Sequence, residues 1–163
     1  MALQNYENVG NTTFELPVIP IKIVSKSGKL PEYATKGSAG MDIRAYIPDH
    51  NSITILPGER KLIPTGLYIQ LLPGYEAQIR PRSGLALKYG ITVLNAPGTI
   101  DSDYRGEIGV ILYNAGNSNF MVDDKDRIAQ MVLCRYDKIH FIQVEELDDT
   151  DRSVNGFGHT GVK

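Results

Sequence analysis

The sequence predicts an all-β protein, a distorted barrel or sandwich of jelly-roll type with one short helix. Tyr75, Ala77 and Ile79 alternate with polar residues, which is the period of two of a half-buried strand. Turn residues such as Pro57-Gly58 and Pro73-Gly74 separate the strand-like segments, and the second pair suits the central positions of a type II turn. Many short strands with turns between them are typical of barrels and sandwiches.

The expected elements follow from this alternation and from the turns. Strands are expected at 18–24, 40–46, 52–56, 67–71, 75–80, 91–94, 107–113, 128–134 and 138–144, and the short helix at 83–89. Both ends are polar or glycine-rich and are expected to be mobile. We therefore expect a flexible N-terminal extension at 1–16, one barrel domain at 17–147 and a mobile C-terminal arm at 148–163.

Composition excludes several classes of partner. The chain has 163 residues, 42% apolar content and a net charge of −2, which fits one domain with a core and argues against nucleic acid as a partner. No apolar run is long enough for a bilayer, so no membrane partner is expected, and the N-terminus lacks the features of a secretory signal. Cys134 is the only cysteine. This indicates a reducing compartment, and we expect the cytoplasm, or also the nucleus if the source is eukaryotic.

Several common chemistries lack their motifs. No GxxxxGK[ST] loop and no GxGxxG follows a strand. His50, His140 and His159 are far apart and show no metal-ligand spacing, and no CxxC or HxE pattern supports a zinc enzyme. Sequence order alone does not exclude a Ser-His-Asp triad, but no nucleophile elbow is present.

Polar clusters interrupt the strands at five places: AGMDIRA (39–45), RPRSGLA (80–86), LNAPGTIDSDYRGEIGV (94–110), RIAQMV (127–132) and RSVNGFGHTG (152–161). Each has an ordinary structural interpretation. Asp42 fits an outward-facing acid of a strand, Arg127 and Gln130 fit a solvated edge, and the last segment fits a disordered glycine-rich end. Ser83 fits a helix cap.

The same residues also suit a phosphate ligand. Free N–H groups of Ser83, Gly84 and Leu85 at a helix N-terminus would attract an anion, and Arg82 would strengthen that site. In the last segment, glycine backbone can approach phosphates closely, and Phe157 can stack on a base.

Taken in order, the five clusters resemble the five motifs of the trimeric dUTPase family, from about Ile21 to Gly161. The resemblance implies a jelly-roll subunit and a homotrimer with three active sites, each built from all three chains. It also implies Mg²⁺-dependent cleavage of dUTP to dUMP and pyrophosphate, which lowers dUTP and supplies dUMP for thymidylate synthesis.

The third cluster carries the base-recognition and catalytic roles that the resemblance implies. Asp101 resembles the general base that activates a water for attack on the α-phosphorus, and an ordinary aspartate is ionised at neutral pH. Tyr104 resembles the residue whose ring underlies the deoxyribose and excludes a 2′-hydroxyl. Asp103 is left between a structural ion pair and direct chemistry. The uracil contacts are expected from Asn95, Gly98, Thr99 and Ile100, whose backbone groups would reject cytosine because its donor and acceptor pattern is opposite.

The other clusters resemble the phosphate and metal contacts of the family. Arg82, Ser83, Gly84 and Gln130 would hold the phosphates, and Arg127 is left between bracing Asp101 or Asp103 and touching substrate. Asp42 would act on Mg²⁺ through a bound water. In the arm, the implied substrate contacts are Arg152, Phe157, Gly158, His159 and Thr160. His159 stands where serine is more common in the family, and Ser153-Val154-Asn155 replace glycines that usually precede the phenylalanine.

Two alternatives stay open at this point. A deoxycytidine triphosphate deaminase has the same fold and would release ammonia rather than pyrophosphate. A non-catalytic, regulatory nucleotide-binding module would keep the pocket without turnover, although the retained Asp101 and arm motif argue against it.

Overall fold

The computed structural model describes residues 17–49, 51–150 and 152–154. The chain forms eleven strands and one helix, in the following order. They are β1 (Lys22–Ser25), β2 (Met41–Arg44), β3 (Ile53–Ile55), β4 (Arg60–Pro64), β5 (Leu67–Gln70), β6 (Tyr75–Arg80), α1 (Ser83–Tyr89), β7 (Ile91–Val93), β8 (Gly98–Ile100), β9 (Gly109–Asn114), β10 (Phe120–Val122) and β11 (Arg127–Arg135).

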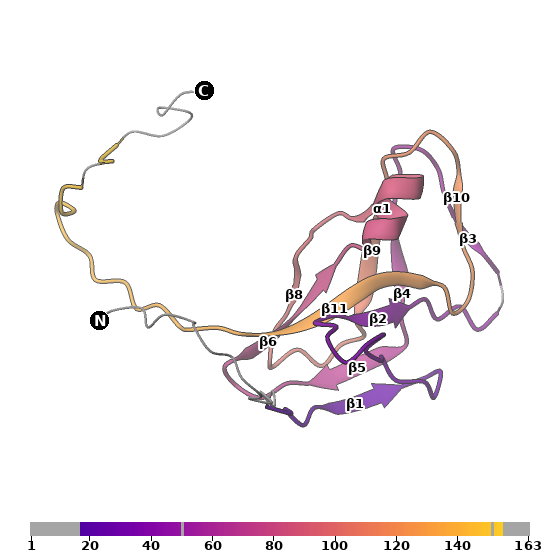
Figure 1. Cartoon of the computed structure of the whole chain (residues 1–163), viewed down its shortest axis with the longest axis horizontal. Helices are drawn as coiled ribbons and strands as arrows, with labels where there is room; N and C mark the ends of the chain where they lie inside the picture. The colour runs from indigo at the N-terminus through magenta and orange to yellow at the C-terminus, as the bar shows by residue number, and fades with distance from the viewer. Residues whose placement is uncertain (1–16, 50, 151, 155–163) are drawn as a thin grey trace, which may run out of the picture.

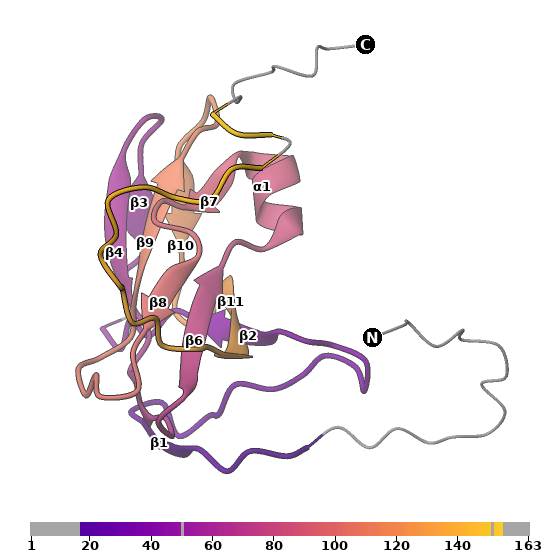
Figure 2. The same ribbon diagram turned by 90° about the vertical axis from the view of Figure 1, so that its left-hand side faces the viewer.

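The strands pair antiparallel in four sheets. The largest has the order β2-β11-β6-β8, a second has the order β4-β9-β7, and β1-β5 and β3-β10 form two-stranded ribbons. Figure 1 and the view turned by 90° in Figure 2 show these sheets grouped in one body, with α1 beside the upper part of β7 and β9. Strands far apart in the sequence, such as β2 and β11, thereby become neighbours.

The core is aliphatic and comes from every sheet. In β6, Ala77 and Ile79 are buried while their neighbours are more exposed, so the predicted alternation is confirmed. The largest fully buried side chains are Ile43, Ile55, Ile63, Ile91, Ile108, Leu112, Ile128, Val110, Val122 and Asn114. Asn114 is satisfied, because its amide donates to the carbonyl oxygens of Ile55 and Ser118, each at 2.9 Å.

The prediction of an all-β chain with one short helix is confirmed, and so is the turn at Pro73-Gly74, where the Tyr75 N–H donates to the Leu72 carbonyl at 3.2 Å. No helix in the described ranges is long and apolar enough to cross a membrane. The strands β4, β8 and β10 were not predicted. Charged Arg60 and Lys61 and the closing Pro64 obscure β4, which tolerates proline because it lies at the edge of its sheet.

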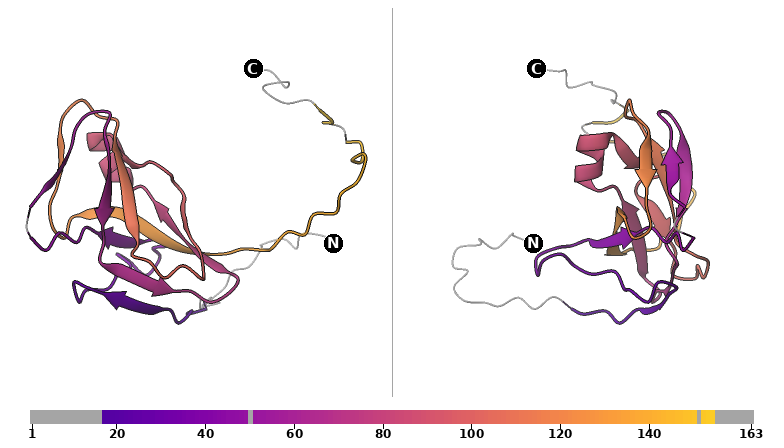
Figure 3. Two further views of the ribbon diagram at one scale, coloured as in Figure 1. Left: turned by 180° about the vertical axis from the view of Figure 1, so that it is seen from behind. Right: turned by 90° about the vertical axis from the view of Figure 1, so that its right-hand side faces the viewer.

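The prediction of a strand at 138–144 is wrong for the described chain. After β11, the backbone runs away from the barrel through 137–150 without pairing to another described strand (Figure 1, and from behind in Figure 3). Its large apolar side chains are exposed: Ile139 79%, Phe141 84%, Ile142 79%, Val144 56% and Leu147 88%. The apolar spacing of 138–144 is typical of a strand, but a strand also needs a neighbouring strand to satisfy its backbone groups.

Candidate active site

The first, second and fourth clusters meet at one end of the four-stranded sheet. Asp42 on β2 accepts from Arg82 Nε at 2.9 Å with one carboxylate oxygen and from Arg127 Nη1 at 3.3 Å with the other. Arg82 also donates to the Arg127 carbonyl at 3.3 Å. Arg127 therefore braces Asp42, rather than Asp101 or Asp103 as one alternative held.

Gln130 and Ser83, the first residue of α1, complete this cluster. It consists of Asp42, Arg82, Ser83, Arg127 and Gln130 and is called the anion-binding group. Gln130 faces Asp42 on β2 and Arg80 on β6, and its amide donates to the Pro81 carbonyl at 2.9 Å. That bond ties β11 to the segment that leads into the helix. Two guanidinium groups face one carboxylate here, so the group carries excess positive charge.

The prediction that Ser83 caps the helix is wrong. The N-cap is Arg82 in an extended conformation, no side chain caps the helix, and Ser83 is its first residue. The Leu85 N–H is also not free, because it donates to the Arg82 carbonyl at 3.1 Å. Among the described residues, the Ser83 hydroxyl and the N–H groups of Ser83 and Gly84 have no hydrogen-bond partner, which leaves them available to a ligand.

The third cluster forms a hairpin whose first strand is β8. Asn95, Gly98, Thr99 and Ile100 line a hollow of about 30 Å³ together with Gly109, Val110 and Ile111 of β9, so the predicted base contacts do lie together. A Cβ on Gly98 would lie 3.1 Å from Asn95 Nδ2, so a larger residue at 98 would press on the Asn95 side chain. The Ala96-Pro97 peptide bond in the turn is cis.

The loop after β8 holds Asp101, the predicted general base. Asp101 is exposed, and its carboxylate makes no hydrogen bond or ion pair with any described residue. Asp103 likewise has no ion pair in this part of the chain, which removes support for its structural interpretation. The loop is closed by bonds from the Tyr104 N–H to the Asp101 carbonyl at 3.2 Å and from Arg105 Nη1 to the Ser102 and Tyr104 carbonyls at 2.7 Å.

One chain does not bring Asp101 to the anion-binding group. In the pairing of β6 with β8, Ile100 lies opposite Ala77, so Asp101 continues toward the start of β6. Ser83 lies beyond the other end of β6, and Ala77 and Arg80 alone are about 10 Å apart at the usual strand rise. A general base must lie within hydrogen-bond reach, about 3 Å, of the water that it activates, and that water must reach a phosphate that the anion-binding group is predicted to hold. The Asp101 hairpin and the anion-binding group therefore lie apart in one chain, as two separate sets of predicted site residues (the half-sites).

Of the predicted contacts in the C-terminal cluster, one lies within the described residues. Arg152 is described and exposed. The other predicted contacts in the arm, which are Phe157, Gly158, His159 and Thr160, lie outside the described residues.

Sequence reasoning missed two residues at the end of the hairpin loop, Gly106 and Glu107. The Glu107 carboxylate accepts from the Gly66 N–H at 2.8 Å, from the Tyr68 hydroxyl at 3.0 Å and from Lys26 Nζ at 3.3 Å. Partial burial alone raises the pKa of Glu107, but these three donors outweigh it and hold that pKa below its ordinary value. The available signal was a glutamate at the start of an otherwise apolar strand.

The described residues contain no group of three or more His, Cys, Asp or Glu side chains that could hold a metal ion by themselves. Asp42 alone, with both oxygens already facing arginines, fits a metal that takes most of its ligands from phosphates and water, as Mg²⁺ does.

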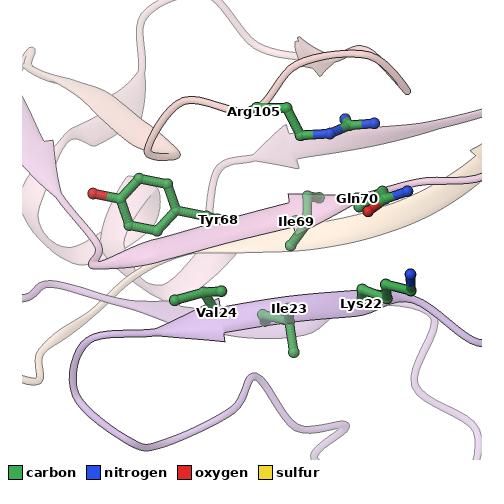
Figure 4. A pocket seen from close by; sticks show the side chains of 7 residues that line it. All are labelled: Lys22, Ile23, Val24, Tyr68, Ile69, Gln70 and Arg105. Carbon is green, nitrogen blue, oxygen red and sulfur yellow. The ribbon is translucent and has the colours of Figure 1, made fainter.

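A separate groove of about 490 Å³ runs along the ribbon of β1 and β5 (Figure 4). Its lining combines apolar and basic side chains: Lys22, Ile23, Val24, Tyr68, Ile69, Gln70 and Arg105. Arg105 brings it next to the hairpin loop, but none of the predicted site residues lines it.

The described chain is thus a jelly-roll-like β-barrel with a cationic cluster around Asp42 and a separate hairpin whose Asp101 carboxylate pairs with no described residue. The dUTPase family model matches residues 26–161 of this chain. The chain belongs to the dUTPase family.

Named relatives and solved structures agree with this assignment. Deoxyuridine 5'-triphosphate nucleotidohydrolases of Finegoldia magna and Fusobacterium nucleatum are 56% and 53% identical over 142 and 144 residues, covering 86% and 88% of this chain and 98% and 97% of theirs. That of Chlamydia pneumoniae is 57% identical over 139 residues, covering 85% of this chain and 94% of its own. A mutant dUTPase of Staphylococcus bacteriophage 80alpha, solved with dUpNHpp, has a TM-score of 0.78 at 23% identity, covering 89% of this chain and all of that one. This likeness confirms the predicted jelly-roll-like fold.

Proposed function

We propose that this chain hydrolyses dUTP to dUMP and pyrophosphate, which makes it a dUTP diphosphatase that limits dUTP and supplies dUMP. The observation that carries the proposal is the identity of 53–57% to deoxyuridine 5'-triphosphate nucleotidohydrolases over almost their whole length. The matched range of 26–161 includes all five polar clusters.

Asp101 is the general base in this proposal. Its exposed carboxylate, unpaired within the described chain, is available to orient a water and take its proton as the water attacks the α-phosphorus. Attack there breaks the bond to the bridging oxygen and expels pyrophosphate in one displacement. Backbone groups of Asn95, Gly98 and Ile100 would read uracil, because donors and acceptors in fixed positions leave cytosine unpaired.

The anion-binding group receives the triphosphate. The Ser83 hydroxyl and the N–H groups of Ser83 and Gly84 would donate to phosphate oxygens, where negative charge develops as the leaving group departs. Arg82 and Gln130 are held within reach by Asp42 and by the Pro81 carbonyl. In the arm, Arg152 and Thr160 would contact the outer phosphates with the backbone of Gly158 and His159, and Phe157 would cover the base.

Mg²⁺ is the proposed cofactor. When bound, it would supply positive charge to the phosphates and stabilise the departing pyrophosphate. Asp42 is the acidic side chain of the anion-binding group and would reach the ion through a bound water. A structure of a mutant dUTPase from phage phi11 of Staphylococcus aureus is described with a coordinated structural Mg(II) ion, which supports the metal for the fold but not its place in this chain.

We further propose a homotrimer in which Asp101 of one chain serves the anion-binding group of another. The opposite placement of the two half-sites along β6 supports a shared site. The exposed segment 137–150 also supports self-association, because it combines large apolar side chains with Glu145, Glu146, Asp148 and Asp149. The groove of Figure 4, apolar with Lys22 and Arg105, offers complementary chemistry on a second copy.

The remaining organisation is proposed on the same basis. Residues 1–16 form an extension before the barrel domain of 17–147, and 148–163 form the arm. We place the protein in the cytoplasm, where deoxynucleoside triphosphates and Mg²⁺ are present, and this placement agrees with an unpaired Cys134.

One assay tests the reaction. Purified protein is incubated with each deoxynucleoside triphosphate and Mg²⁺ while pyrophosphate, orthophosphate and ammonia are measured. We expect pyrophosphate and dUMP in equal amounts from dUTP alone. Ammonia from dCTP without pyrophosphate would instead identify a deaminase, and nucleotide binding without any product would identify a regulatory module.

A further inference from the structure

At the end of the hairpin loop, Gly106 and Glu107 form a support, called the seat, that holds the Tyr104 ring in place. The Tyr104 hydroxyl donates to the backbone carbonyl of Glu107 at 3.0 Å, which turns the ring back over Gly106. Tyr104 is 44% exposed, so part of the side chain lies against the loop and part is open to a ligand.

Gly106 is required by this arrangement. A Cβ at this position would lie 2.5 Å from Cζ of Tyr104 and 3.0 Å from its Cε2, closer than real Cβ contacts. The obstructing atoms belong to the end of a partly exposed side chain rather than to backbone. An alanine at 106 would therefore displace the ring and break its bond to Glu107, at little cost to the fold.

Glu107 fixes the other side of the seat to the body of the barrel. Its carboxylate is bound by the Gly66 N–H, the Tyr68 hydroxyl and Lys26, which come from the turn before β5, from β5 itself and from the segment after β1. The next residue continues the attachment, because the Ile108 N–H donates to the Leu67 carbonyl at 2.8 Å. The carbonyl that accepts from Tyr104 is thus held to β5 on both sides.

We propose, on the basis of the function proposed above, that Gly106 and Glu107 are positioning residues that hold the Tyr104 ring where it supports a deoxyribose and excludes a 2′-hydroxyl. An aromatic ring rejects an extra hydroxyl only if it cannot move aside. With Gly106 leaving room below the ring and Glu107 fixing its hydroxyl, Tyr104 has one orientation. Substrate choice between dUTP and UTP thereby depends on two residues that contact neither nucleotide.

The measurement is the ratio of kcat/KM for dUTP to kcat/KM for UTP. A variant that merely unfolds in part lowers both values equally and leaves the ratio unchanged, so the ratio separates positioning from stability. We expect Gly106→Ala and Tyr104→Phe, which removes the anchoring hydroxyl, each to lower the ratio about tenfold or more. Glu107→Ala should lower it as well, and Glu107→Gln, which keeps an acceptor oxygen for the Gly66 N–H, should restore part of it.

Gly37→Ala is the matched control, because a Cβ at Gly37 meets no atom within 4 Å and its φ is not positive. It should keep the wild-type ratio. Tyr104→Ala separates the two levels of the proposal. If it leaves the ratio unchanged, the expected role of Tyr104 against the deoxyribose is wrong. If Tyr104→Ala lowers the ratio while Gly106→Ala and Tyr104→Phe keep it at the wild-type value, the seat formed by Gly106 and Glu107 is refuted. Should Gly106→Ala fail to fold, Tyr104→Phe and Glu107→Ala decide the question.

Discussion

The Asp101 side chain is the residue on which turnover should depend most. Asp101→Asn keeps the shape and the acceptor oxygen but removes the proton acceptor, so we expect a rate loss on the order of 10²- to 10⁴-fold. Calorimetric binding of a non-hydrolysable dUTP analogue should be largely retained, since the carboxylate makes no contact that orders the described loop. Near-normal pyrophosphate release by this variant would remove Asp101 from the mechanism.

Asp42 should matter through the metal rather than through the fold. Asp42→Asn keeps an oxygen for Arg82 or Arg127 but loses the charge that would attract a hydrated Mg²⁺. We expect the Mg²⁺ concentration for half-maximal activity to rise about 10- to 100-fold, with kcat at saturating Mg²⁺ affected less. Asp49→Asn, an exposed acid outside the anion-binding group, is the control. Identical Mg²⁺ titrations of both variants would contradict a metal role for Asp42.

Glu107 should make stability depend on pH in a defined direction. Its pKa is lowered in the folded chain, so the ionised carboxylate stabilises the fold above its unfolded pKa, and that contribution is lost as pH falls through the folded pKa. Thermal unfolding of wild type and Glu107→Gln should thus differ most near neutral pH. The two Tm values should converge below about pH 4. A difference in Tm that is constant across pH would show that the charge of Glu107 is irrelevant to stability.

For single residues, the sequence predicted which side chains belong to the candidate site better than it predicted what those side chains contact. Asp101, Tyr104 and Ser83 were selected because the ordered clusters that contain them resemble the motifs of the dUTPase family. Their contacts were not predictable from spacing. Arg127 and Asp42 are far apart in the chain and meet only because β11 pairs with β2, and Ser83 begins the helix instead of capping it.

At the scale of elements, the arm is the segment whose removal should be most selective. Deleting 152–163 removes Arg152, Phe157 and Thr160 but none of the described strands. We expect an unchanged assembly by light scattering and severely slowed hydrolysis, because the outer phosphates and the base lose their cover. Phe157→Ala should be intermediate, since stacking on one base is worth about 1–3 kcal/mol. A truncated chain as fast as the intact one would exclude a role for the arm in catalysis.

Strands with one buried face were predicted from their hydrophobic pattern, and strands without such a pattern were missed. The alternation in β6 and the apolar run of β9 were found because those strands lie against the core on one side. β8 was not predicted, since Gly98, Thr99 and Ile100 carry almost no hydrophobic pattern and become a strand only by pairing with β6. The segment 138–144 shows the reverse, because its apolar spacing is clear and its pairing partner is absent from the described chain.

At the scale of the whole molecule, the separation of the two half-sites makes the assembly itself testable. Static light scattering should give a mass of about 54 kDa, three times the 18.0 kDa of one chain. A fully active monomer would contradict the shared site, because Asp101 and Ser83 of one chain lie off opposite ends of the β6–β8 pair.

Co-expression of two inactive variants tests the sharing directly. One chain carries Asp101→Asn, the other lacks 152–163, and the two bear different affinity tags so that mixed assemblies can be purified. If the base and the arm of every site come from neighbouring chains of a closed trimer, about a third of the sites in the purified mixed trimers should be complete, one in each trimer. If each site took both from one chain, no assembly of these variants would contain a complete site, and the mixture would stay inactive. Two chains that both carry Asp101→Asn give the background, and restored pyrophosphate release above that background is the expected result.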